Sequence, residues 1–169
     1  MAKKVLLICT TGSLGSVIAE ELSQRSVLVR RPNRLSAHVN ATRFVEAVEL
    51  GDVLQEAMKG QDAVIFCLAG DLPRMFAQVR QAMEQNGVSR IVAISSIEIY
   101  NNPVKAILRP YRALGTVVEA SGLEYTVIRP DWFTSANKVD YDITHKGEPE
   151  IPGSISRKSI ASYISDIHL

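Results

Sequence analysis

Small residues at a regular spacing follow the first apolar run of the chain. The run Val5 to Cys9 leads into a stretch that matches G-x-x-G-x-x-G, with Cys9 at the first glycine position. In such a turn the later glycines let the backbone approach a diphosphate and let the following helix pack closely. The diphosphate then binds the unpaired N–H groups of that helix. The pattern predicts a dinucleotide-binding turn at Thr10, Thr11, Gly12, Ser13, Leu14 and Gly15. An ordinary strand-to-helix turn is the alternative.

Two arginines follow the second apolar run. In "VLVRRPNR", Arg30 and Arg31 come after Val27 to Val29, where an NAD-selective site would carry a carboxylate for the ribose hydroxyls. A guanidinium pairs well with a 2′-phosphate and is a poor substitute for that carboxylate. These residues predict that NADP(H) is preferred over NAD(H). A solvated basic loop is the alternative.

Other kinds of reactive site are not indicated. His38, His145 and His168 are scattered without metal-ligand spacing, so no metal site is predicted. Cys9 and Cys67 each end an apolar run, which is typical of buried, reduced thiols. The chain contains no G-x-x-x-x-G-K-[ST] loop, which argues against a nucleotide triphosphatase.

Composition limits the partners. The formal net charge is +1 over 169 residues, which favours neither nucleic acid nor a membrane surface as a partner. No apolar run approaches the roughly 20 residues that span a bilayer, and the run after Lys3-Lys4 is too short for a signal peptide. We therefore expect a cytoplasmic protein that binds a small-molecule substrate or a regulatory protein; no oligomeric state follows.

Apolar runs alternate with helical patterns along the chain. Leu72, Phe76, Val79 and Met83 share one helical face that Asn86-Gly87 ends, and a helix is expected near 109–120. Unbroken apolar strands favour burial on both faces of a parallel sheet. The fold prediction is α/β: a doubly wound, Rossmann-type parallel sheet with helices on both faces and a small irregular C-terminal lobe.

One domain is expected, in two parts. Residues 1–130 would form the dinucleotide-binding core, and residues 131–169 a small substrate lobe. Within this lobe, alternation over Val139 to Ile143 predicts a half-exposed strand, and Ile160, Ile164 and Ile167 predict a helix. No helix-capping signal precedes Leu169, which is the pattern expected of a lobe that is truncated or disordered at its C-terminus.

Further segments follow one another at ordered spacings. They are "VRRP" at 29–32, "GDV" at 51–53, "DAVIFCLAG" at 62–70, "GVSRIVAISSIEIY" at 87–100, "ASGLEYTVIRPDWF" at 120–133 and "SRKSIASYI" at 156–164. With this set the chain resembles an atypical short-chain dehydrogenase/reductase of the NmrA-like, NAD(P)H-binding family. The resemblance covers essentially the whole chain.

The resemblance implies a place for each segment around the cofactor. Asp52 and Val53 would hold the adenine, residues 68–70 would pass beneath the ribose, and Ser95 and Pro130 would lie beside the nicotinamide. Each segment follows a predicted strand, where open α/β sheets bind ligands. The expected cofactor-binding residues are Thr10, Thr11, Gly12, Ser13, Leu14, Gly15, Arg30, Arg31, Asp52, Val53, Leu68, Ala69, Gly70, Ser95 and Pro130.

The chain departs from this superfamily in its tyrosines. Reductases of this kind commonly use Tyr-x-x-x-Lys, in which the phenol protonates a carbonyl substrate. None of the five tyrosines is followed by a lysine four residues later, and Tyr111 stands where the lysine would fall. Interconversion of alcohols and ketones is therefore not expected, and no residue is assigned a catalytic role.

Two functions fit this pattern. The first is an NADPH-dependent reductase of a planar or activated molecule, quinone- or flavin-like, which accepts a hydride with little help. Its substrate-binding candidates are Ser96, Tyr111, Trp132 and Phe133. The second is a non-catalytic NADP(H)-binding redox sensor that binds a regulatory protein partner. A third alternative is that Cys9 spoils the turn and no cofactor binds.

Replacing Arg30 by glutamate tests the cofactor prediction. A carboxylate would repel the 2′-phosphate and remove charge-assisted hydrogen bonds of about 1.5–3 kcal/mol. We expect Arg30→Glu to bind NADPH about 10- to 100-fold more weakly while NADH affinity changes little, measured by titration calorimetry. An unchanged ratio of the two affinities would contradict the assignment.

Overall fold

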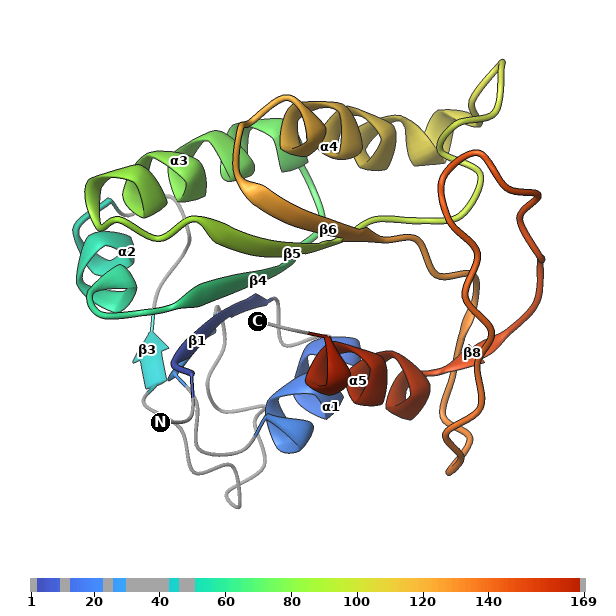
Figure 1. Ribbon diagram of the computed structural model, residues 1–169, viewed down its shortest axis with the longest axis horizontal. Helices are drawn as coiled ribbons and strands as arrows, with labels where there is room; N and C mark the ends of the chain where they lie inside the picture. Colours follow the sequence, from blue (N-terminus) through green and yellow to red (C-terminus); the bar gives the residue numbers. More distant parts are fainter. Residues whose placement is uncertain (1–2, 10–12, 23–25, 30–42, 46–50, 168–169) are drawn as a thin grey trace.

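The computed structural model describes residues 3–9, 13–22, 26–29, 43–45 and 51–167, and its centre is a parallel sheet (Figure 1). Its strands are β1 (Val5–Cys9), β2 (Ser26–Val29), β3 (Arg43–Val45), β4 (Ala63–Cys67), β5 (Arg90–Ile94) and β6 (Glu124–Ile128). Their spatial order is β3-β2-β1-β4-β5-β6, and every neighbouring pair is parallel. The order reverses between β1 and β4, as in a doubly wound Rossmann-type sheet. The predicted fold class is confirmed.

Successive residues of the central strands enter two different apolar cores. Leu6 and Ile8 pack on the side of α2 (Gly51–Met58), α3 (Leu72–Gln85) and α4 (Arg109–Glu119). Leu7 and Cys9 pack on the side of α1 (Ser13–Glu21) and α5 (Arg157–Asp166). Figure 1 shows α2, α3 and α4 above the sheet and α1 and α5 below it. This burial on both faces explains the unbroken apolar strands.

The helix predictions agree with the observed elements. α3 ends at Gln85, directly before Asn86, and Gly87 has a φ of +68°. That left-handed conformation is easy for glycine, and the N–H of Val88 bonds the carbonyl of Met83 across the turn. α4 follows the short 3-10 helix η2 (Ala106–Leu108) and covers the range that the sequence predicts.

The segment after β6 is largely irregular. Two short strands, β7 (Phe133–Thr134) and β8 (Ile155–Ser156), pair in parallel. The predicted strand over Val139 to Ile143 is wrong, because both of these side chains are more than half exposed and the alternation has no buried face. The backbone of Asp140 instead bonds the Ser159 hydroxyl, through its N–H at 3.0 Å and its carbonyl at 3.1 Å.

Helix α5 is fixed at its first turn by a buried serine. The Ser156 hydroxyl accepts a hydrogen bond from the N–H of Ser159 at 3.0 Å and donates to the Lys138 carbonyl at 2.6 Å. The predicted apolar face is confirmed, since Ile160 and Ile164 are buried and Ile167 packs against the same core. This face packs α5 against α1.

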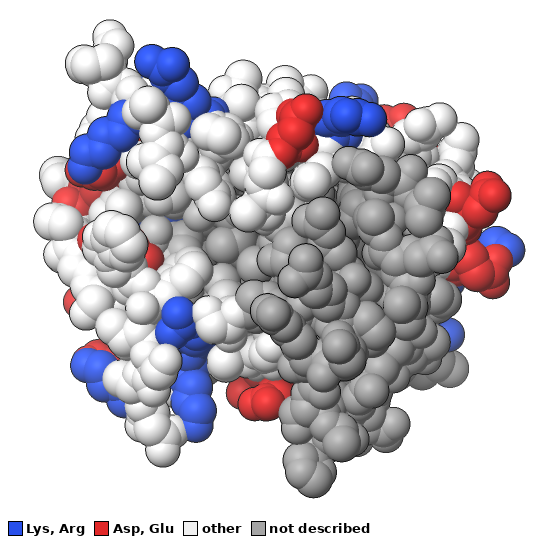
Figure 2. Space-filling model, turned by 180° about the vertical axis from the view of Figure 1, so that it is seen from behind, with Lys and Arg blue, Asp and Glu red and all other residues white. Residues whose placement is uncertain are grey.

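The surface carries mixed charge. In Figure 2 positive and negative side chains of the described residues are scattered among uncharged ones and form no extended patch of one sign. Within the described ranges, no helix is long and apolar enough to cross a membrane.

Removing the Ser156 hydroxyl tests the anchoring of α5. Loss of the N-cap and of the bond to Lys138 should lower the free energy of unfolding by about 1–3 kcal/mol. We expect Ser156→Ala to lower the urea midpoint with an unchanged m-value. Ser165→Ala, at an exposed position of the same helix, is the matched control and should stay within about 0.5 kcal/mol. Equal midpoints for both variants would contradict the capping role.

Candidate cofactor site

The carboxyl ends of the parallel strands bring the predicted segments to one edge of the sheet. Ser13 follows β1 at the start of α1, residues 68–70 follow β4, Ser95 follows β5 and Pro130 follows β6. The strand order reverses between β1 and β4, and open α/β sheets bind their ligands at such a reversal. The predicted residues Thr10, Thr11, Gly12, Arg30 and Arg31 lie outside the described residues.

The start of α1 is the described part of the predicted diphosphate-binding turn. Ser13 is exposed at the first turn, whereas Leu14 and Gly15 are buried beneath it. The first turn of a helix carries the positive end of the helix dipole, which attracts an anion. The Ser13 hydroxyl accepts a hydrogen bond from Nε of Arg157, at 2.8 Å.

Arg157 lies beside the start of α1, a neighbour that the sequence reasoning missed. It lies 144 residues from Ser13 in the chain and reaches the turn only because α5 packs against α1. Its Nη1 also donates to the Ser135 hydroxyl at 3.2 Å. The one available signal was an arginine at the start of a predicted helix, where a cation is disfavoured by the helix dipole.

The bend after β4 brings backbone to the surface. Leu68 is buried, while Ala69 and Gly70 are exposed, and Gly70 has a φ of +123°. A Cβ at Gly70 would also lie 3.3 Å from the terminal carbon of Met75. Only glycine adopts this conformation without strain. The bend therefore presents a side-chain-free surface, as the prediction for the ribose requires.

Asp52 and Val53 lie in the first turn of α2. The Asp52 side chain is exposed, and Val53 packs against the core under α2, α3 and α4. A carboxylate in the first turn is also favoured by the helix dipole. Asp52 therefore has a structural role in α2 that does not require a bound adenine.

Ser95 uses its hydroxyl to connect two elements. It is buried, and its hydroxyl donates to the Tyr111 carbonyl at 3.0 Å, while its N–H bonds the Ile128 carbonyl at 2.8 Å. This arrangement joins the end of β5 to α4 and β6. The neighbouring Ser96 is half-buried.

The other predicted substrate residues lie in different surroundings. The Tyr111 side chain packs, partly buried, against the core under α3 and α4. Trp132 is 80% exposed, and Phe133 is exposed with Arg157 stacked on its ring at 5.7 Å.

A cavity of about 510 Å³ lies along β6. Its other walls are the segment 138–146, residues 150–155 and α5. Four of the five tyrosines of the chain line it, namely Tyr100, Tyr125, Tyr141 and Tyr163. Pro130, predicted beside the nicotinamide, also lines it, whereas Ser96, Tyr111, Trp132 and Phe133 do not.

Tyr100 lies at the centre of a charged cluster in this cavity. Arg129 and Lys146 lie 5.0 and 4.6 Å from its ring centre. Its hydroxyl donates to Glu119, which also accepts from Lys146 at 2.6 Å. Burial, and then the bond to Glu119, raises the pKa of Tyr100. The phenol is therefore protonated at neutral pH, and its proton is already shared with a carboxylate.

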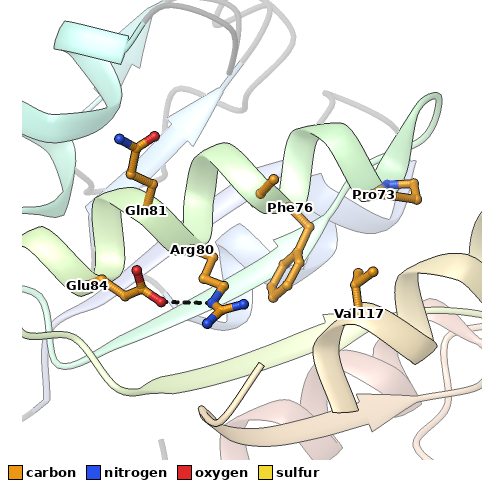
Figure 3. A pocket seen from close by; sticks show the side chains of 7 residues that line it. Pro73, Phe76, Arg80, Gln81, Glu84 and Val117 are labelled. Carbon is orange, nitrogen blue, oxygen red and sulfur yellow. Dashed lines mark hydrogen bonds and ion pairs between the residues drawn. The ribbon is translucent and has the colours of Figure 1, made fainter. Parts of the chain in front are cut away.

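A smaller hollow of about 330 Å³ lies between α3 and α4 (Figure 3). Phe76 and Val117 form its apolar side, and Arg80 and Glu84 pair beside it at 2.8 Å. None of the predicted site residues lines it.

The two cysteines face each other in register on β1 and β4. Both thiols are free, as predicted, and burial raises the pKa of Cys9 and of Cys67 to about 12. In the part of the chain that the structure describes, no cluster of three or more His, Cys, Asp or Glu residues could hold a metal.

Comparison with known proteins identifies the family. The model of a family described as NAD(P)H-binding matches residues 10–168. This chain belongs to that NAD(P)H-binding, Rossmann-fold family. No curated protein matches it.

Solved structures share the fold over most of the chain. A Rossmann-fold NAD(P)-binding family protein from Shigella flexneri is 30% identical, with a TM-score of 0.84 over 98% of this chain and 86% of that one. A short-chain dehydrogenase/reductase from Veillonella parvula, in complex with NADP, is 17% identical, with a TM-score of 0.85 over 98% of this chain and 87% of that one. An NADPH-dependent quinone oxidoreductase from Escherichia coli, complexed with NADPH, is 22% identical, with a TM-score of 0.63 over 75% of this chain and 49% of that one.

The described residues fit such a cofactor. The start of α1 offers N–H groups, the Ser13 hydroxyl and the Arg157 guanidinium, which are the donors that a diphosphate accepts from. The Gly70 bend leaves room for a ribose against the backbone.

The cysteines give a direct test of burial at the ends of β1 and β4. At pH 8 a thiol with a pKa of about 12 is roughly 1,000-fold less ionised than an ordinary thiol, and only the thiolate is alkylated. We expect iodoacetamide to label the folded protein about 1,000-fold more slowly than the urea-unfolded protein, followed by mass spectrometry. Rapid labelling of either cysteine in the folded protein would show an accessible, reactive thiol.

Proposed function

We propose that this protein is an NADPH-dependent reductase of planar, electron-poor small molecules, quinone- or flavin-like, and an atypical short-chain dehydrogenase/reductase of the NmrA-like type. The observation that carries the proposal is the tyrosine-lined cavity along β6, which Pro130 joins to the predicted nicotinamide position. Its volume of about 510 Å³ lies within the roughly 300–1,000 Å³ typical of small-molecule sites. Aromatic walls favour a flat, aromatic ligand because rings pack well in offset-stacked or edge-to-face arrangements.

The lack of a proton relay supports this class of substrate. Bound NADPH would supply a hydride, and a quinone that accepted it would need only a proton from water to give the hydroquinone, with NADP⁺ as the other product. The Ser95 hydroxyl donates to a backbone carbonyl and the Tyr100 hydroxyl to Glu119, so neither is aligned to protonate a ketone. The protein's own contribution is binding and orientation.

The preference for NADPH over NADH is part of the proposal. It depends on Arg30 and Arg31, in the place of the ribose-binding carboxylate. Support also comes from the complexes of the Veillonella parvula and Escherichia coli proteins, which contain NADP and NADPH.

The activity test measures loss of NADPH absorbance with menadione or FMN as acceptor. We expect turnover with these acceptors and none with simple ketones. Tyr141→Ala removes a ring that packs edge-on against Tyr163, at 5.7 Å between ring centres, and should raise the KM for menadione about tenfold. The Kd for NADPH should stay the same.

Ile107→Ala is the matched control, because Ile107 is 77% exposed and does not line the cavity. Equal KM values for the two variants would place the substrate elsewhere. Tight NADPH binding without turnover of any acceptor would contradict the reductase and leave the NADP(H)-binding redox sensor as the function.

A further inference from the structure

The guanidinium of Arg157 lies where two helices begin. Arg157 is the first residue of α5, and its Nε bonds Ser13, the first residue of α1. Both helix starts carry partial positive charge, which disfavours a cation. An anion placed beside the guanidinium would be favoured by both helix starts and by the charge of Arg157.

No acidic side chain compensates this charge among the described residues. Arg157 belongs to none of the ion pairs found there. Thr10, Thr11 and Gly12, which precede α1, are uncharged residues. Among the described residues, the hydroxyls of Ser13 and Ser135 accept from two of the five N–H donors of the guanidinium, and no other hydrogen-bond partner of this side chain is found there.

The small second sheet holds the side chain in place. β7 and β8 pair with Phe133 opposite Ile155 and Thr134 opposite Ser156, so the next residues, Ser135 and Arg157, follow side by side. The ring of Phe133 stacks on the guanidinium at 5.7 Å. These contacts fix the fork before a ligand arrives, which lowers the entropy lost on binding.

We propose that Arg157 binds the diphosphate of the nicotinamide cofactor, together with the start of α1. The inference rests on the proposed function. It adds Arg157, from the C-terminal segment, to the residues expected to bind the diphosphate at the start of α1. The diphosphate is common to NADPH and NADH, whereas the 2′-phosphate belongs to NADPH alone. Arg157 therefore contributes affinity to both cofactors without selecting between them.

The test is titration calorimetry of Arg157→Gln with NADPH and, separately, with NADH. We expect both Kd values to rise about 10- to 100-fold and their ratio to stay that of the unaltered protein. Quenching of emission from Trp132, the single tryptophan, provides an independent readout of NADPH binding. Arg157→Lys keeps the charge without the fork and should give an intermediate loss.

Lys158→Gln is the matched control. Lys158 is the next residue on α5, exposed, and its ammonium bonds the side chain of Asn137. This variant should bind both cofactors as the unaltered protein does. Thermal unfolding without cofactor checks that each variant is folded, and Arg157→Lys provides the test if Arg157→Gln does not fold.

The outcomes separate the two proposals. If the unaltered protein binds NADPH and the folded Arg157 variants bind it equally well, Arg157 is only a structural link between α5 and α1, and the reductase proposal stands. A loss for NADPH alone would place Arg157 at the 2′-phosphate and overturn the diphosphate assignment. If the unaltered protein binds neither cofactor, the proposed function itself fails.

Discussion

Burial of the central strands on both faces determines where this protein can bind a ligand. Every residue of β1 and β5 is buried, so these strands have no side chain to offer to solvent. In β1 and β5 the groups that could contact a ligand are therefore confined to the strand ends, whereas β6 also exposes side chains along its length. Because the strands are parallel, all their carboxyl ends open at one edge, and the segments after β1, β4, β5 and β6 lie there. The position of the site is a consequence of how the core is packed.

The parts of this architecture that depend on local patterns could be predicted from the sequence. The apolar runs mark β1, β4 and β5, and the spacing from Leu72 to Met83 marks α3. A strand buried on both faces gives an unbroken apolar run, and a helix gives apolar residues at a 3.6-residue period. Both patterns can be recognised within a short stretch of sequence. The bend at Gly70 and the exposed start of α1 likewise follow from short motifs.

What could not be predicted depends on contacts between distant residues. Val139 to Ile143 alternates like a strand, yet Ser159 bonds the backbone of Asp140 and holds the segment in an irregular conformation. Arg157 meets Ser13 across 144 residues, and the cavity along β6 is assembled from several segments. No local window contains this information. The paired strands β7 and β8 are too short, at two residues each, to leave a periodic signal.

The packing of α5 against α1 also has a consequence for biosynthesis. Along the chain α5 follows α1, β6 and the long irregular segment, so it is synthesised after all of them. Until α5 emerges, the apolar surface that it covers, which includes the end of β5 at Ile94, has no partner from its own chain. A chain synthesised only as far as β6 therefore exposes this apolar surface until α5 has been made. Exposed apolar surface of this kind is what causes incomplete chains to aggregate or to bind chaperones. The layer that α1 and α5 form on one face of the sheet is therefore completed only after every strand of that sheet has been synthesised.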